Sequence, residues 1–146
     1  MNMQQDNMGD AMPPSVIVAK LFDDLVAALE EARLSIAEGR IEDRFRAVAV
    51  STEIVGDLAA GLEEPAQDDW TRRTGALYRY LQRLFLAANL RNDAKAIDEA
   101  MMLVEPVRRA WQCMAAEEKL RAELARRGVR KDAAAVADWL ESAAAD

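Results

Sequence analysis

Apolar residues recur along most of this chain at steps of three and four, and this spacing restricts the possible folds more than any other feature. Such steps place side chains on one face of an α-helix. Short polar stretches, most of which contain Pro or Gly, separate the periodic segments. The sequence therefore predicts four long helices and a short last one, at about 15–38, 41–62, 70–90, 94–116 or further, and 132–144.

Residues that begin or end helices lie between these segments. Gly39 is placed to adopt the left-handed conformation that follows many helices. Asp68 or Asp69 is suited to cap the third helix, and Asn92 or Asp93 to end it and cap the fourth. The helix ends thus agree with the apolar pattern.

Pro106 lies inside the fourth predicted helix. Pro lacks a backbone N–H and clashes with the preceding turn, which costs about 3 kcal/mol in a regular helix. Because the apolar spacing continues on both sides, we expect a bend rather than a break, and we expect Gly128 to end the helix.

The second predicted helix carries two apolar rows. Ile54 and Leu58 belong to the smaller row. A helix of this kind can contact two neighbours, or one neighbour and a ligand. The larger row follows a heptad pattern and consists of Ile41, Phe45, Val48, Thr52, Val55, Ala59 and Leu62.

Amphipathic helices joined by short connections pack antiparallel to one another. We therefore expect an all-α fold, an antiparallel up-down four-helix bundle with a short additional C-terminal helix. The polar start of the chain ends in Pro13-Pro14, and Gly128 follows the fourth helix. This predicts a flexible N-terminal segment at 1–14, the bundle domain at 15–127, and a tail with a short helix at 128–146.

The residue types that most enzymes need are missing. The chain has no histidine, the commonest general base and zinc ligand. Its six glycines are dispersed and form no phosphate-binding loop. The lone Cys113 fits a half-buried helix residue better than a catalytic thiol. We therefore expect a binding protein rather than an enzyme, with no cofactor and no metal site.

Charge and hydropathy indicate where the protein works. The formal net charge is -7, whereas a nucleic-acid-binding protein normally carries a basic patch, so we expect no nucleic-acid partner. A single cysteine permits no internal disulfide. No stretch approaches the roughly 18 apolar residues that cross a bilayer, and residues 1–10 lack the pattern of a secretory signal. The sequence predicts a cytoplasmic protein without stable membrane insertion.

One stretch is too specific to reflect helix formation alone. Residues 75–93 contain Leu-Tyr-x-Tyr, then a Leu, then Ala-Asn before an acidic helix start. Leu21-Phe22-Asp23 precedes this stretch, and Arg108-x-x-Trp111 follows it. The residues that carry the motif are Leu77, Tyr78, Tyr80, Leu84, Ala88, Asn89, Asp93 and Trp111.

Together these motifs, over about residues 15–114, resemble the FliS family of flagellin-specific export chaperones. The resemblance implies a bundle that binds the disordered C-terminal segment of flagellin in outer hydrophobic grooves. Such binding prevents premature polymerisation and supports delivery to the flagellar type III export apparatus. It implies flagellin and that apparatus as partners, with a helix-in-groove mode of recognition.

The extra apolar rows of the second, third and fourth helices are the candidates for this groove. Each such residue could equally belong to the bundle core, and the sequence leaves that choice open. Tyr78 and Tyr80 diverge by about 200° on a helix, so at most one can point straight into the core. The predicted groove residues are Ile54, Leu58, Tyr78, Leu81, Phe85, Ile97, Met101 and Val104.

Two other functions stay open on the sequence alone. The bundle could be an adaptor or regulator of flagellar assembly that binds a different partner. A helical enzyme would need a pocket with strongly perturbed carboxylates.

Overall fold

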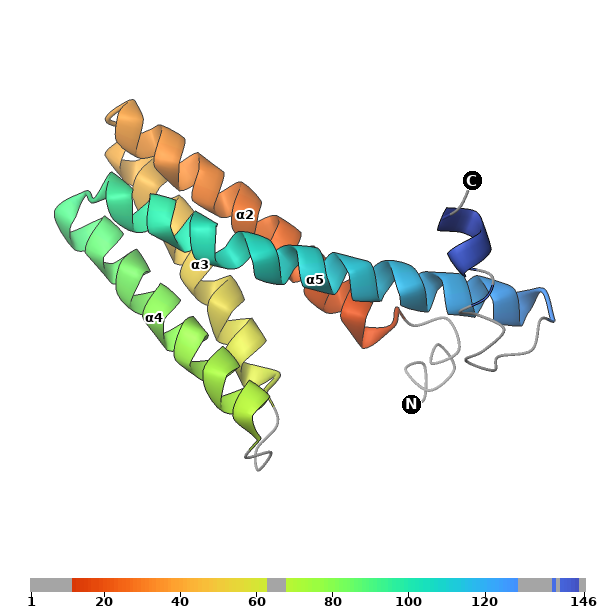
Figure 1. The fold of residues 1–146 in the computed structure, drawn as a ribbon. Coiled ribbons are helices and arrows are strands. Elements are labelled where there is room, and N and C mark those ends of the chain that lie inside the picture. The colour runs from red at the N-terminus through yellow and green to blue at the C-terminus, as the bar shows by residue number, and fades with distance from the viewer. Residues whose placement is uncertain (1–11, 63–67, 129–137, 139, 145–146) are drawn as a thin grey trace, which may run out of the picture. The chain divides into compact units, whose positions relative to one another are not determined.

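The computed structural model describes residues 12–62, 68–128, 138 and 140–144. Asp138 and residues 140–144 are helical and belong to the short additional helix near the C-terminus (Figure 1). The predicted all-α bundle with a short last helix is therefore confirmed. Within the described residues the four long helices are α2 (Pro14–Ala37), α3 (Ile41–Ala60), α4 (Asp69–Arg91) and α5 (Ala94–Arg126).

The chain divides into two compact units. Val18–Arg109 form the bundle, with α3 and α4 complete, most of α2 and the first half of α5. The other unit comprises Met1–Ile17 and Ala110–Asp146. The boundaries expected from the sequence, after residues 14 and 127, stay a prediction, and residues 1–11 of the expected flexible segment lie outside the described residues.

The helix ends follow the predicted capping residues. Gly39 has a φ of +70°, and Asn92, with a φ of 53°, ends α4 in the left-handed conformation. The Asp68 carboxylate accepts a hydrogen bond from the backbone N–H of Thr71 at 2.7 Å. Asp93 Oδ1 accepts bonds from the first backbone N–H groups of α5. These contacts satisfy donors that a helix leaves unpaired at its start.

Helix α5 is continuous through Pro106 and extends to Arg126. This confirms the expectation that the helix does not break there. Gly128, with a φ of +79°, follows its end.

The bundle has a dense apolar core. Each fully buried aliphatic or aromatic side chain contributes about 1.5–3 kcal/mol to folding. Leu25 and Leu29 of α2 lie in this core, together with residues from the other three helices. The bundle side chains that are no more than 1% exposed include Phe22, Val48, Val55, Leu81, Phe85, Ala88, Ile97, Ala100 and Val104.

The heptad row expected from the sequence is buried on α3 only in part. Val48 and Val55 of that row lie in the core, whereas Ile41 and Phe45 are 66% and 60% exposed. The buried face also includes the small residues Ala47 and Ser51, together with Ile54. Small side chains let α3 approach its neighbours closely, and apolar spacing alone cannot detect such a preference.

Polar contacts join α2 and α5 at the surface of the bundle. Helices α2 and α5 are linked by ion pairs between Arg33 and Asp98, at 2.8 Å, and between Arg108 and Asp23, at 3.1 Å. Exposed pairs of this kind add little stability, about 0–1 kcal/mol each. They mainly fix which faces of the helices meet.

None of the helices in the described part of the chain is long and apolar enough to span a membrane.

Candidate functional site

The structure places most of the predicted groove residues inside the bundle. Met101 is half-buried, and the other seven are at most 8% exposed. They would contact a partner only if the helices moved apart, so their role in binding stays a prediction. The seven buried residues are Ile54, Leu58, Tyr78, Leu81, Phe85, Ile97 and Val104.

The two tyrosines of the sequence motif take different positions, as their spacing requires. Tyr78 is 4% exposed, and its burial raises the pKa of the phenol. Tyr80 is half-buried and donates a hydrogen bond to the Glu99 carboxylate, which raises the pKa of Tyr80. The Arg83 guanidinium lies 5.6 Å from the centre of the Tyr80 ring. Tyr78 therefore belongs to the core, and Tyr80 ties α4 to α5.

The rest of the motif shapes the turn between α4 and α5. Arg44 donates hydrogen bonds to the Asn92 side chain at 2.7 Å and to the Asn89 carbonyl at 3.4 Å. Ala88 is fully buried beside this turn, and Asp93 caps α5. Leu77, Leu84 and Trp111 are half-buried. The Arg44 hydrogen bonds thus join α3 to the end of α4, and the Asp93 carboxylate accepts from the start of α5.

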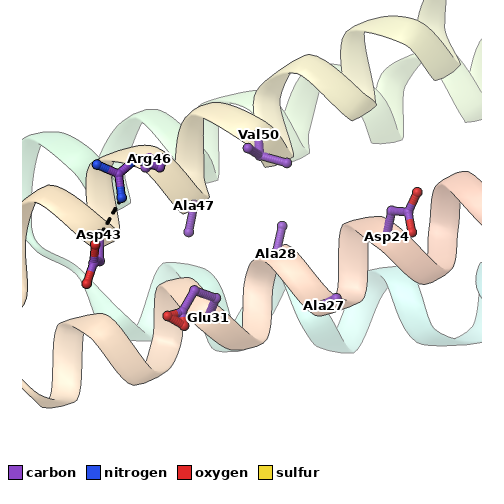
Figure 2. Close-up of a pocket in the computed structure, with 8 residues that line it drawn as sticks. All are labelled: Asp24, Ala27, Ala28, Glu31, Asp43, Arg46, Ala47 and Val50. Carbon is purple, nitrogen blue, oxygen red and sulfur yellow. Dashed lines mark hydrogen bonds and ion pairs between the residues drawn. The ribbon is translucent and has the colours of Figure 1, made fainter.

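A groove lies between α2 and α3 (Figure 2). It has a volume of about 380 Å³. Ala28 and Ala47 point into the space between the two helices (Figure 2). Val50, which is 42% exposed, lines the groove beside them. Small floor residues allow another helix to approach closely.

Charged side chains form the rim of this groove, namely Asp24, Glu31, Asp43 and Arg46. Arg40 holds Glu31 at 3.3 Å and Asp43 at 2.6 Å. Arg46 also pairs with Asp43, at 3.1 Å (Figure 2). The Arg40 hydrogen bond lowers the pKa of Asp43. Because these charges are already paired, the groove suits the apolar face of a helix better than a charged small ligand.

A second hollow is lined by residues of α3 alone. It has a volume of about 480 Å³ and is lined by Ile41, Glu42, Phe45, Arg46 and Ala49. Ile41, Phe45 and Ala49 follow one another at steps of four, so they share one helix face.

The sequence did not predict the groove between α2 and α3 or the hollow on α3, for a physical reason. The alanines of the groove carry no strong apolar signal. Ile41 and Phe45 do carry one, but their heptad spacing indicated a core position. The two apolar rows of α3 were the one sign in the sequence that this helix has apolar residues to spare. Only packing decides which residues of each row are covered.

Most of this chain is similar in sequence to proteins of one family. Residues 1–118 match the family described as Flagellar protein FliS. The flagellar secretion chaperone FliS of Salmonella typhimurium strain LT2 is 34% identical over 100 residues, which are 68% of this chain and 74% of the relative. The flagellar secretion chaperone FliS of Escherichia coli strain K12 is 32% identical over 97 residues, 66% of this chain and 71% of the relative.

Proposed function

Because the chain belongs to the FliS family of flagellar proteins, we propose that it is a cytoplasmic flagellar secretion chaperone that binds the disordered C-terminal segment of flagellin. The bound chaperone covers apolar side chains of the client, prevents premature polymerisation and supports delivery to the type III export apparatus. No catalytic step is part of this proposal.

The observation that carries the proposal is the apolar groove between α2 and α3. The bundle buries its core and still leaves this recess with an alanine-rich floor and a paired charged rim. A disordered segment that folds on binding buries about 1,000–3,000 Å² and loses about 2–5 kcal/mol to ordering. A preformed groove reduces that loss because only the client has to become ordered.

The position of Val50 allows a direct test of the groove. Val50→Glu places a charge against the apolar floor, and Glu is well tolerated in helices. We expect calorimetric titration with a flagellin C-terminal peptide to show binding at least about tenfold weaker than for the parent chain. Leu86→Glu is the matched control, since Leu86 is an exposed aliphatic residue of α4 outside the groove. Its affinity should stay within about threefold of the parent value.

Circular dichroism must show that both variants are folded. If Val50→Glu binds the peptide as well as the parent chain does, the groove is not the client site. If the parent chain does not bind the peptide at all, an adaptor role with a different partner is the better interpretation.

The groove residues predicted from the sequence need a variant of their own, because most of them are buried. Leu58→Glu would unfold the bundle, because Leu58 is 6% exposed, and it could not report on binding. Met101 is half-buried, and its neighbour Met102 is 75% exposed. Met101→Glu therefore tests whether α5 contributes to the client site, and loss of peptide affinity in a folded protein would support that role.

A further inference from the structure

Helix α4 carries an excess of positive charge in a chain that is negative overall. Its sequence holds five arginines and one aspartate, whereas the formal net charge of the whole chain is -7. In the described part of the chain, the arginines of α2 and α5 all pair with carboxylates, as Arg33 does with Asp98 at 2.8 Å. On α4, Arg79 and Arg83 have no such pair with any residue that the structure describes. Their guanidinium groups therefore have donors to spare.

Two exposed leucines continue the face on which these arginines lie. Leu86 is 60% exposed and Leu90 is 75% exposed. The two arginines and two leucines follow one another at steps of four, three and four, so they share one side of the helix. A basic half thus passes into an apolar half over about 17 Å of helix. The α4 face, as this surface is called below, consists of Arg79, Arg83, Leu86 and Leu90.

One of the arginines is held in place before any partner arrives. The Arg83 guanidinium lies 5.6 Å from the centre of the Tyr80 ring, and the Tyr80 hydroxyl is bonded to the Glu99 carboxylate. A contact with the face of an aromatic ring leaves the N–H groups of an arginine free to donate. A partner carboxylate therefore meets a donor group that has already lost part of its conformational freedom.

The chemistry of the α4 face selects one kind of partner. Carboxylates match the arginines, and aliphatic side chains match the leucines. A nucleic acid or an anionic membrane is a poorer match, because the net charge of -7 repels phosphates and the leucines find no partner on them. An amphipathic helix with acidic residues beside its apolar stripe offers both groups at helical spacing.

We propose that the α4 face is a docking site for an acidic amphipathic helix of a second protein, whose carboxylates pair with Arg79 and Arg83 and whose aliphatic side chains pack on Leu86 and Leu90. This inference goes beyond the proposed function, because the groove between α2 and α3 stays available to flagellin.

The interaction is transient. Exposed ion pairs contribute about 0–1 kcal/mol each, and one helix face buries less than the roughly 1,600 Å² of a standard interface. The expected dissociation constant is therefore about 10–100 µM. Such a partner exchanges rapidly on a chaperone that keeps its client.

Two designed peptides serve as probes. The first is an alanine-rich helix with two glutamates and then two leucines at the spacing of the α4 face, and the second has the leucines first, so that both orientations are covered. At least one peptide should bind the parent chain in fluorescence anisotropy with a dissociation constant of about 10–100 µM at about 0.1 M salt. Its affinity should fall severalfold at about 0.5 M salt, because exposed ion pairs are screened.

Charge reversal provides the sharpest comparison. Arg79→Glu/Arg83→Glu should weaken binding of the probe at least about tenfold, and it should bind better than the parent chain does to a peptide with lysines in place of the glutamates. The matched control is Arg73→Glu, since Arg73 is an exposed arginine of α4 that lies about 100° around the helix from this face. Its affinity for the probe should stay within about threefold of the parent value.

The two surfaces should respond to opposite variants. Leu86→Glu is expected to abolish binding of the probe and to leave the flagellin peptide bound, whereas Val50→Glu is expected to do the reverse. The parent chain saturated with flagellin peptide should bind the probe with unchanged affinity. Failure of the groove and failure of the α4 face are therefore seen separately.

Several results would overturn this proposal, provided that circular dichroism shows each variant to be folded. One is that neither peptide binds, and another is that the double arginine variant binds the probe as the parent chain does. If flagellin peptide displaces the probe, the α4 face belongs to the client. If a single-stranded DNA oligonucleotide or vesicles with anionic lipid bind through Arg79 and Arg83 while both peptides fail, the face recognises phosphates instead.

Discussion

At the scale of single residues, Asn92 has two roles, one through its backbone conformation and one through its side chain. Its φ of 53° lies in the left-handed region, which non-glycine residues adopt at a cost. Its side chain also accepts the hydrogen bond from Arg44 that joins the end of α4 to α3. Asn tolerates the left-handed conformation better than most residues, and its amide supplies the acceptor. Asn92 therefore contributes both a backbone conformation and a contact between helices.

Substitution separates the two roles of Asn92. Asn92→Ala loses the acceptor and meets the left-handed penalty, whereas Asn92→Gly loses only the acceptor. We expect the alanine variant to be less stable than the glycine variant by about 1 kcal/mol in chemical denaturation. Equal stabilities would show that backbone conformation contributes nothing at this position.

At the scale of an element, the start of α4 depends on one carboxylate. Asp68 accepts from the Thr71 backbone N–H at 2.7 Å. Hydrogen bonds from the side chain and then from the backbone of Thr71 lower the pKa of Asp68. Asp68 therefore determines where α4 begins.

Removal of the cap should cost measurable stability. Asp68→Ala is expected to lower the free energy of unfolding by about 1 kcal/mol at neutral pH, because a donor of the first turn loses its partner. Asp68→Asn keeps an acceptor at the same place, and Asn and Asp rank about equally as N-cap residues. Its free energy of unfolding should therefore lie within about a few tenths of a kcal/mol of the parent value. Urea denaturation of the three proteins checks this order, and a destabilised Asn variant would contradict it.

At the scale of the whole molecule, arginines hold acidic side chains ionised at several places on the bundle. Hydrogen bonds from Arg40 and Arg108 lower the pKa values of Asp43 and Glu105 respectively. A carboxyl whose pKa is lower in the folded state stabilises the fold above its unfolded pKa. That stability is lost as the pH falls through the folded value.

The melting temperature should therefore change little between pH 7 and about 5 and fall steadily below about pH 4, where unfolded carboxyls take up protons. Asp68→Asn removes one contributing group, so its decline should be shallower than that of the parent. Thermal melts followed by circular dichroism at several pH values measure both slopes. If the melting temperatures of the two proteins fall in parallel as the pH is lowered, Asp68 does not contribute to the pH dependence of stability.

The bundle core should respond cooperatively to a cavity. Leu81 is completely buried between the helices, whereas Leu86, on the same helix, is 60% exposed. Leu81→Ala is expected to cost about 2–5 kcal/mol of unfolding free energy. Leu86→Ala should change it by no more than about 0.5 kcal/mol. Similar losses in denaturation for both variants would contradict the assigned core.

The sequence by itself determined the number of long helices, their approximate ends and the family motif. These features depend on local physics: apolar spacing defines a helix face, and Asp68, Asn92 and Asp93 act on the backbone groups beside them. For the same reason the divergence of Tyr78 and Tyr80 followed from helix geometry alone.

Only the tertiary structure decided which apolar face is covered. Ile54 and Leu58 were predicted to line a groove and lie in the core, while Ile41 and Phe45 fitted a core seam and lie at the surface. Val48 and Val55 of the heptad row are buried, so each row has covered residues, and helical spacing alone does not tell which residues these are. The choice depends on how closely neighbouring helices approach the small residues Ala47 and Ser51, and that distance is a property of the packed bundle.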